Sequence, residues 1–310
     1  MSGIGVIHNP NAKKNRGKNH IVPSLRKIVG KSGIVEETKH PDEIPRATEK
    51  FRNMDIDILA INGGDGTNHL TLTHFLKVYA GQPIPPFIHL RGGTMNTVAN
   101  SLGISREPTE QILKKIADKY TRREKMDVIK RNIMKIGDKY GFIFGSGLVA
   151  NFLEAYYEGR TTGPGKAIRV IAKSIISAIS RTEYIKKLFM PVNARVSADS
   201  REIPLRYFTL LLGATIKDVG LGFKPTYLGD KAGTFHLLAS DISPIRVILS
   251  LPKVLKGIPL GLKNVHDLLV QNLTVEPMNG VMRYTIDGEL YSTNKKFDVQ
   301  IGPALTVIRG

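Results

Sequence analysis

The 310-residue sequence contains no cysteine and no tryptophan. Without cysteine, neither a disulfide framework nor a thiolate metal site can form, and this absence fits a cytoplasmic protein. No apolar run approaches the roughly 18 residues that a helix needs to span a bilayer. The first residues also lack the basic region and long apolar run of a signal peptide, so we expect none. Any contact with a membrane is therefore expected at its surface.

Acidic residues are few. The sequence has 27 Asp and Glu against 45 Lys and Arg, a net charge of +18. A positive field of this size attracts polyanions such as nucleic acid, anionic lipid or a nucleotide. Because the sequence shows no RNP, zinc-finger or helix-turn-helix motif, we expect no nucleic-acid partner. The apolar fraction of 41% is sufficient for a packed core, and the length indicates one or two domains.

The first part of the chain alternates strand-like and helical patterns. Short apolar runs occur at 4–7, 34–35, 56–61 and 87–90, and helical patterns at 21–29, 42–51, 68–79, from 96 and from 108. Such alternation predicts a parallel sheet covered by helices on both faces. We therefore predict a Rossmann-like three-layer α/β domain over residues 1–126.

The pattern changes near Asp127. Strand-like runs then dominate, at 128–129, 133–136, 142–144, 207–212, 235–238, 268–275 and 284–286, with helical inserts at 166–180 and 244–256. This pattern predicts a mostly antiparallel β-sandwich domain over residues 127–302. The last apolar run, 305–308, is expected to return to the first domain, so that residues 303–310 complete it.

The central motif is Asn62-Gly63-Gly64-Asp65-Gly66-Thr67, which lies between a strand and a helix. Its glycines let the backbone approach a bulky anion, and the start of the helix offers N–H groups to a phosphate. Thr67 can donate a hydroxyl hydrogen bond. Asp65 repels phosphate, so we interpret it as a Mg²⁺ ligand or as a residue that orients the loop. The alternative, a tight turn with a capping Asp, is less consistent with this strand–loop–helix context.

A second loop, 91–96, has the same design: Arg91-Gly92-Gly93-Thr94-Met95-Asn96 follows one strand and precedes a helix. In an open parallel sheet, ligands gather at the carboxyl ends of the strands, so both loops are expected on one rim. Asn9-Pro10-Asn11 follows the first strand and Thr38 the second. Together these segments predict a binding cleft for a nucleotide.

Two carboxylates flank a glycine at Asp287-Gly288-Glu289. One carboxylate could accept the proton of an attacking hydroxyl, and the other could position it or help to hold a metal. Asp-Gly is also a strong pair for a hairpin turn. The spacing alone leaves both interpretations open.

Together these motifs resemble the diacylglycerol-kinase-like bacterial lipid kinases, relatives of the sphingosine and ceramide kinases and, more distantly, of NAD kinases. The resemblance runs over nearly the whole chain and includes Leu102-Gly103-Ile104 and Asp127. It implies a lipid kinase that transfers the γ-phosphate of ATP to a hydroxyl of a membrane lipid, with Mg²⁺. The GGDGT loop is shared with NAD kinases, so a kinase for a soluble acceptor and a non-catalytic nucleotide- or lipid-binding relative remain alternatives.

The resemblance also implies roles for individual residues. Glu289 would accept the proton, with Asp287 beside it, and Asp65 would contact Mg²⁺ together with ATP. The first domain would bind the nucleotide, and the β-rich domain would hold the lipid acceptor. The implied ATP-binding residues are Asn9, Thr38, Gly63, Gly64, Asp65, Gly66, Thr67, Asn68, Gly93, Thr94 and Asn96.

The sequence departs from the family pattern at several positions. His69 and Leu70 stand where the family usually has Asn and Glu, and Thr97 stands where it usually has Asp. Ala232 occupies a position at which some members bind a structural Mg²⁺, so we expect no structural metal there. These departures leave an altered or lost activity open.

Two segments combine basic and aliphatic residues, 165–187 and 245–263. A basic helix with an aliphatic stripe can lie on an anionic membrane. The same stripe can instead belong to the core, with the basic face in solvent. We expect a peripheral protein on an anionic membrane surface, and the sequence leaves a homodimer open.

Overall fold

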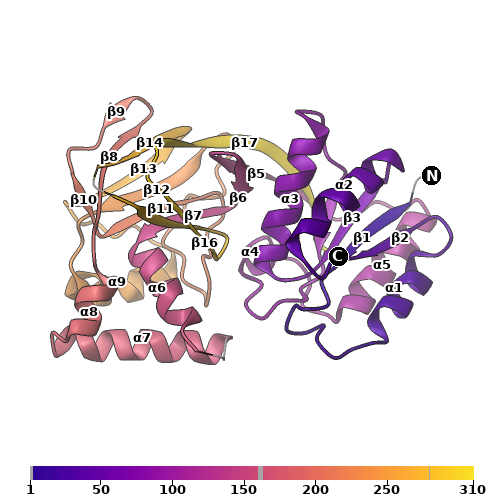
Figure 1. Ribbon diagram of the computed structural model, residues 1–310, viewed down its shortest axis with the longest axis horizontal. Coiled ribbons are helices and arrows are strands. Elements are labelled where there is room, and N and C mark those ends of the chain that lie inside the picture. The colour runs from indigo at the N-terminus through magenta and orange to yellow at the C-terminus, as the bar shows by residue number, and fades with distance from the viewer. Residues whose placement is uncertain (1–2, 160–162, 279) are drawn as a thin grey trace. The chain divides into compact units, whose positions relative to one another are not determined.

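The computed structural model describes residues 3–159, 163–278 and 280–310. It divides into two compact units (Figure 1). The first comprises Met1–Arg131 and Ala304–Gly310, and the second Asn132–Pro303. The chain passes between them along β5, Val128–Ile136, and β17, Phe297–Ile308. The boundaries predicted from sequence lie at 126 and 302.

The first unit is built on a parallel sheet in the order β2-β1-β3-β4, with the end of β17 beside β4. The strands are β1 (Ile4–His8), β2 (Ile34–Glu37), β3 (Ile58–Asn62) and β4 (Phe87–His89). Every residue of β1, β3 and β4 is buried, as expected for strands covered on both faces. Val307 of β17 pairs with Phe87, so the return of the chain to this sheet is confirmed.

Helices cover both faces of this sheet. They are α1 (Ile21–Val29), the 3₁₀ helix η1 (Pro41–Glu43), α2 (Ile44–Asn53), α3 (Asp65–Tyr79), α4 (Thr97–Ser101) and α5 (Thr109–Thr121). Helix α2 packs against α3 on one face, and α1 packs against α5 on the other (Figure 1). The predicted three-layer α/β arrangement is thus confirmed. Helix α3 begins three residues earlier than the sequence pattern indicated, so it includes Asp65 and Gly66.

The strand order creates a switch point between β1 and β3. The chain leaves β1 toward β2 on one side, and then crosses back over β1 to form β3 on the other. The connections after β1 and β3 therefore run to opposite faces of the sheet. In open parallel sheets, ligands bind outside the carboxyl ends of the strands at such a point. Here that position belongs to the segments that follow His8 and Asn62.

The second unit is an antiparallel β-sandwich, as predicted. One sheet has the order β13-β12-β11-β7-β15-β16, and the other places β10, β8, β14 and β17 side by side. The strands are β6 (Lys139–Gly141), β7 (Ile143–Gly147), β8 (Val192–Ala198), β9 (Arg201–Glu202), β10 (Tyr207–Phe208), β11 (Leu210–Ala214), β12 (Phe235–Ser240), β13 (Val265–Val270), β14 (Asn272–Pro277), β15 (Met282–Ile286) and β16 (Glu289–Thr293). Alternate residues, such as Ala194 and Val196 of β8 and Phe235 and Leu237 of β12, form the core between the sheets.

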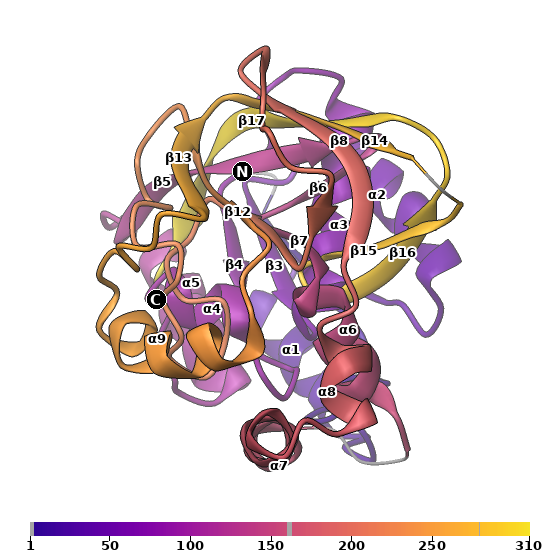
Figure 2. The same cartoon turned by 90° about the vertical axis from the view of Figure 1, so that its left-hand side faces the viewer.

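Four helices of the second unit lie together on one side of its strands (Figure 2). They are α6 (Leu148–Tyr157), α7 (Pro164–Ile179), α8 (Glu183–Leu188) and α9 (Pro244–Lys256). Ile185 and Leu188 form a small core there with Phe152 and Ile248. Among the described residues, no helix is both long and apolar enough to cross a membrane.

The sequence pattern did not identify α6, α8, β6, β8, β9 or β16. The run 268–275, predicted as one strand, is two strands that turn at Gln271. The turn is fixed from outside the run, because the Asp199 side chain accepts hydrogen bonds from the backbone N–H groups of Gln271 and Asn272, at 3.0 and 2.9 Å. A distant acceptor of this kind is invisible to local periodicity.

Candidate active site

Three loops meet at the carboxyl ends of β1, β3 and β4. The side-chain amide of Asn9 donates a hydrogen bond of 2.8 Å to the Thr67 hydroxyl. The backbone N–H of Gly93 donates to the carbonyl of Gly63 at 2.9 Å, and that of Lys14 donates to the carbonyl of Gly92 at 3.0 Å. The loops after these three strands thus form one connected rim, as predicted from sequence.

The glycines of the rim are required for close packing of the loops. A Cβ atom on Gly93 would lie 2.4 Å from the Cα of Gly64, and one on Gly63 would lie 2.4 Å from the Cβ of Thr67. None of these glycines adopts a positive φ. Their value is therefore the missing side chain, which lets two backbones touch. The sequence interpretation assigned the glycines to an approaching anion, and the structure adds this second requirement.

The start of α3 is suited to an anion. Its N-cap, Gly64, is extended, with φ −94°, and no side chain caps the helix. The first N–H groups of a helix have no partner within it, and the helix dipole places partial positive charge there. Gly64, Asp65 and Gly66 are partly exposed, so an anion can reach them. A phosphate group fits this helix start.

Asp65 links the two glycine loops. Its carboxylate accepts hydrogen bonds from the backbone N–H groups of Thr97 and Val98, at 2.9 and 3.0 Å, and so caps α4. This geometry matches the loop-orienting role considered for Asp65. Among the described residues no group of three or more His, Asp and Glu is arranged to hold a metal. Asp65 stays the one residue that the family resemblance implies for contact with Mg²⁺ bound with ATP.

Four of the predicted ATP-binding side chains are buried, namely Thr38, Thr67, Asn68 and Asn96. The backbone N–H of Thr38 donates to the His8 carbonyl at 2.8 Å, which ties β2 to β1. Asn96 adopts a left-handed conformation, with φ 48°, and its amide donates to the Gly93 carbonyl at 2.9 Å. Thr38 and Asn96 thus shape the rim through these contacts. Thr94 and Asn9 are partly exposed at the rim.

The departures at His69 and Leu70 lie within α3. The His69 side chain is fully buried, and Leu70 is partly buried. Thr97, the third departure in this unit, contributes its backbone N–H to Asp65. That contact uses no side-chain atom of Thr97, so the Asp65 cap does not depend on which residue stands there.

Sequence reasoning assigned no role to the polar residues that end the strands, His8, Asn62 and His89, although Asn62 opens the central motif. The Asn62 amide donates to Nδ1 of His8 at 2.9 Å. Burial lowers the pKa of both His8 and His89 below the usual 6.5. His8 therefore remains neutral near pH 7 and accepts this bond. A polar residue at the last position of an otherwise apolar strand was the available signal.

Lys14 was also missed. Lys14 is exposed overall, but part of its side chain is shielded from solvent. This shielding lowers the pKa of Lys14, and the charges of Arg91 and Lys18 lower it further. The neighbouring Asn15 donates to the Asn9 carbonyl at 2.8 Å and so fixes this loop to the rim. Cations that repel one another beside an uncapped helix start are stabilised when a polyanion binds between them. The basic run from Lys13 to Arg16 was the signal in the sequence.

In the second unit, Asp287 and Gly288 form the two-residue turn between β15 and β16. Both have positive φ, 47° and 90°, as a type I′ turn requires. Asp287 is buried, and its Oδ1 accepts hydrogen bonds from the backbone N–H groups of Phe142 and Ile143, at 2.9 and 2.8 Å. The Tyr157 hydroxyl donates to the Gly288 carbonyl at 2.9 Å. This turn is therefore rigidly anchored.

Glu289 follows the turn and is exposed. It opens β16 opposite Ile286, so the anchored turn fixes its backbone. Burial, followed by the charge of Glu289, raises the pKa of Tyr291 two residues further on. Asp287 and Glu289 belong to the second unit, and the predicted ATP-binding residues belong to the first.

The stretch around Ala232 contains an ion pair. Nζ of Lys217 lies 2.7 Å from Oδ2 of Asp230. Ala232 itself has no side chain that can ligate a metal. A cation from the protein therefore already neutralises the carboxylate of this loop, and we still expect no structural metal there.

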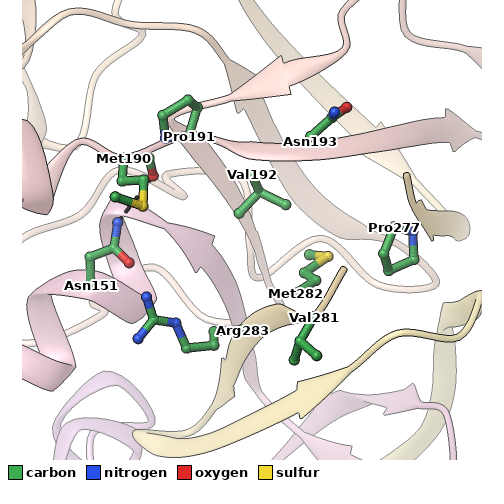
Figure 3. Close-up of a pocket in the computed structure, with 9 residues that line it drawn as sticks. All are labelled: Asn151, Met190, Pro191, Val192, Asn193, Pro277, Val281, Met282 and Arg283. Atoms are coloured by element: carbon green, nitrogen blue, oxygen red, sulfur yellow. Dashed lines mark hydrogen bonds between the residues drawn. The ribbon is translucent and has the colours of Figure 1, made fainter. Parts of the chain in front are cut away.

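A cavity of about 180 Å³ also lies in the second unit (Figure 3). Met190, Val192 and Met282 contribute apolar surface to it. Two of its polar side chains are engaged by the protein, because the Asn151 amide donates to the Leu188 and Met190 carbonyls and Arg283 pairs with Glu154. None of the residues predicted from sequence lines this cavity.

The chain is similar to several known proteins. Residues 3–130 match the sequence model of the family described as diacylglycerol kinase catalytic domain. A crystal structure from Bacillus anthracis str. Sterne, provisionally described as a diacylglycerol kinase, matches 100% of this chain and 97% of its own, with a TM-score of 0.70 and 15% identity. A second structure of that description matches with a TM-score of 0.69 and 16% identity over the same shares.

A more distant likeness is to yeast NADH kinase complexed with NADH. That structure matches 99% of this chain and 83% of its own, with a TM-score of 0.51 and 11% identity. At such identities these structures show a shared fold. No curated protein matches the chain.

Proposed function

We propose that the chain transfers the γ-phosphate of ATP to a hydroxyl of a membrane lipid. The proposal is supported by the match of residues 3–130 to the diacylglycerol kinase catalytic domain, and by motifs and a fold like those of the diacylglycerol-kinase-like family. The acceptor is a diacylglycerol-, sphingoid- or ceramide-like lipid. The protein is cytoplasmic and acts at the membrane surface.

The observation that carries this proposal is the rim of the first unit. An uncapped helix start, partly exposed at Gly64, Asp65 and Gly66, lies at the switch point of a parallel sheet. The loop that follows β1 brings Lys14 to the same rim. Backbone N–H groups and a nearby cation can together bind a polyphosphate. Mg²⁺, bound with ATP, would neutralise charge on the phosphates, and Asp65 is the residue that would contact it.

The reaction needs a group that accepts the proton of the acceptor hydroxyl. We assign this role to Glu289, because its carboxylate is exposed and its backbone is held by the anchored turn. Glu289 takes the proton as the hydroxyl oxygen bonds to the γ-phosphorus and the bond to the ADP oxygen breaks. Asp287 is buried, so we assign it to positioning the turn. Most of the rate enhancement then comes from placing the reactants.

A direct test presents the acceptors side by side. The protein is incubated with γ-labelled ATP, Mg²⁺ and, separately, diacylglycerol, a sphingoid base, ceramide or NAD. The proposal predicts a labelled lipid. If NAD is the only acceptor that becomes labelled, the acceptor is a soluble molecule and the lipid proposal is wrong. Clear ATP binding without transfer to any acceptor would favour a non-catalytic relative and contradict the proposal.

A further inference from the structure

The buried side chains of helix α7, which include Val170, are smaller than isoleucine, and three of its isoleucines are exposed. Ala167, Ser177 and Ala178 are buried, whereas the side chains of Ile176 and Ile179 are 66% and 70% exposed. Ile168 is exposed on the same face, because it lies eight and eleven residues before them along a helix. Ile168, Ile176 and Ile179 are therefore not part of the core, whereas Ile171 and Ile175 of the same helix are partly buried.

Helix α9 has the same character. Ser250 is the one buried side chain among its described residues, whereas Ile245, Leu249 and Leu255 are exposed. Leu249, 73% exposed, is the most exposed large hydrophobic residue in the part of the chain that the structure describes. Helices α7 and α9 contact each other and lie on the same side of the second unit (Figures 1 and 2). We call the exposed aliphatic residues of these two helices the docking face.

The charges beside the docking face have one sign. Neither helix contains Asp or Glu, and together they carry Lys166, Arg169, Lys173, Arg246, Lys253 and Lys256. Arg169 directly follows the exposed Ile168 in the sequence. Helices with exposed aliphatic residues flanked by Lys and Arg are typical of proteins that lie in the interface of a membrane. The positive charges favour a surface that contains anionic lipids.

We propose that the docking face inserts into the headgroup region of an anionic lipid bilayer, with Arg169 and Lys256 on lipid phosphates. This inference deepens the proposed function and rests on it for its purpose, because a lipid kinase must reach an acceptor that stays in the bilayer. The surface itself follows from exposure and charge alone.

The test is flotation of the full chain with vesicles of phosphatidylcholine that contain about 30% phosphatidylglycerol. We expect binding to these vesicles, and binding at least about tenfold weaker to pure phosphatidylcholine. The variant Ile176→Asp with Leu249→Asp should weaken binding at least about tenfold, because it places charge where aliphatic surface enters the bilayer. Replacing Arg169 and Lys256 by Gln should weaken it about fivefold for each charge.

A matched control is Val281→Asp. Val281 is 66% exposed, as is Ile176, and lies in the second unit outside both helices. This variant should bind vesicles as the wild type does. All variants should keep the wild-type unfolding midpoint, since none of the altered side chains is buried. Equal binding by the wild type and the Ile176→Asp, Leu249→Asp variant would overturn the inference.

Transfer assays in detergent micelles separate this inference from the proposed function. If the variants phosphorylate a micellar lipid at the wild-type rate but lose activity on vesicles, both statements hold. If the wild type binds vesicles through the docking face but never transfers phosphate, the kinase proposal fails alone. If the wild type phosphorylates micellar lipid but does not bind anionic vesicles, the membrane-docking inference is wrong and the kinase proposal stands. If the wild type is a dimer that does not bind vesicles, and the Ile176→Asp, Leu249→Asp variant is a monomer, the docking face contacts a second copy of the chain and not a membrane.

Discussion

Removal of the Asp287 carboxylate should destabilise the second unit. In Asp287→Ala, the backbone N–H groups of Phe142 and Ile143 lose their common acceptor, Oδ1. Each buried donor left without a partner costs about 1–3 kcal/mol. The left-handed conformation at φ 47° adds about 1–2 kcal/mol for a residue other than Gly, Asn or Asp. Because such terms overlap, we expect a loss of about 4 kcal/mol in the free energy of unfolding.

The matched variant is Asp287→Asn. The amide oxygen of Asn can occupy the place of Oδ1 and accept both hydrogen bonds, and Asn tolerates the left-handed conformation. The charge is lost, and an NH2 donor replaces Oδ2, which accepts a longer bond of 3.2 Å from the Phe142 N–H, so we expect a destabilisation of about 1–2 kcal/mol. Denaturant unfolding of wild type, Asp287→Ala and Asp287→Asn, with kinase activity measured on the same samples, gives the comparison. Asp287→Asn should keep its rate within about tenfold, since a buried positioning group does not meet the substrate.

Two results would refute this reasoning. If Asp287→Ala unfolds within about 1 kcal/mol of the wild type, the buried hydrogen bonds of the turn do not support the fold. If Asp287→Asn is as stable as the wild type but loses as much activity as a Glu289 variant, the charge of Asp287 acts on the reacting groups. Asp287 would then be catalytic, and not a residue that positions the turn.

Further predictions concern the first unit. Gly93→Ala should lower the free energy of unfolding by about 2–3 kcal/mol. Gly64→Ala should lower it by less than about 1 kcal/mol, because its Cβ would lie 3.4 Å from the Cα of Gly93. Equal effects in denaturant unfolding would contradict the loop packing. Asp65→Asn turns one of the two oxygens that accept from Thr97 and Val98 into an NH2 donor, so it should lower the free energy of unfolding by about 1–3 kcal/mol. It should also lower transfer at least about tenfold if Asp65 contacts Mg²⁺, and an unchanged rate would leave capping as its role. Burial lowers the pKa of His8 and His89 below 6.5, so the unfolded chain binds more protons than the folded chain as the pH falls through 6.5. The free energy of unfolding should therefore be at its full value above pH 6.5 and decrease below it. A free energy of unfolding that stays constant down to about pH 5.5 would contradict this prediction.

The strand–loop–helix pattern was sufficient to predict the α/β domain and the common rim. Both depend on local periodicity and on the rule that parallel strands end at one edge. The sequence pattern also placed Gly63 and Gly93 on adjacent loops. It did not reveal that the two loops touch, because the contact between Gly93 and Gly64 joins segments that lie far apart in the chain.

Other features depend on contacts that no local pattern contains. The Asp287-Gly288 pair suggested either catalysis or a turn, and only the bonds from Phe142 and Ile143 show that Asp287 is buried within an anchored turn. The isoleucines of α7 have the spacing of a core helix, yet smaller residues fill its buried face. Periodicity identifies an apolar face, whereas tertiary packing decides whether that face is covered.

The most direct test of the proposed kinase activity compares phosphate transfer by the wild type, Glu289→Gln and a control, Glu202→Gln, an exposed glutamate of the same unit. We predict that Glu289→Gln lowers the transfer rate at least about 100-fold, with ATP binding and the unfolding midpoint unchanged, because the proton of the acceptor hydroxyl loses its base. Glu202→Gln should transfer phosphate at the wild-type rate. Transfer to lipid by Glu289→Gln at the wild-type rate would contradict the assignment of Glu289, and no transfer by the wild type to any lipid would contradict the proposed function itself.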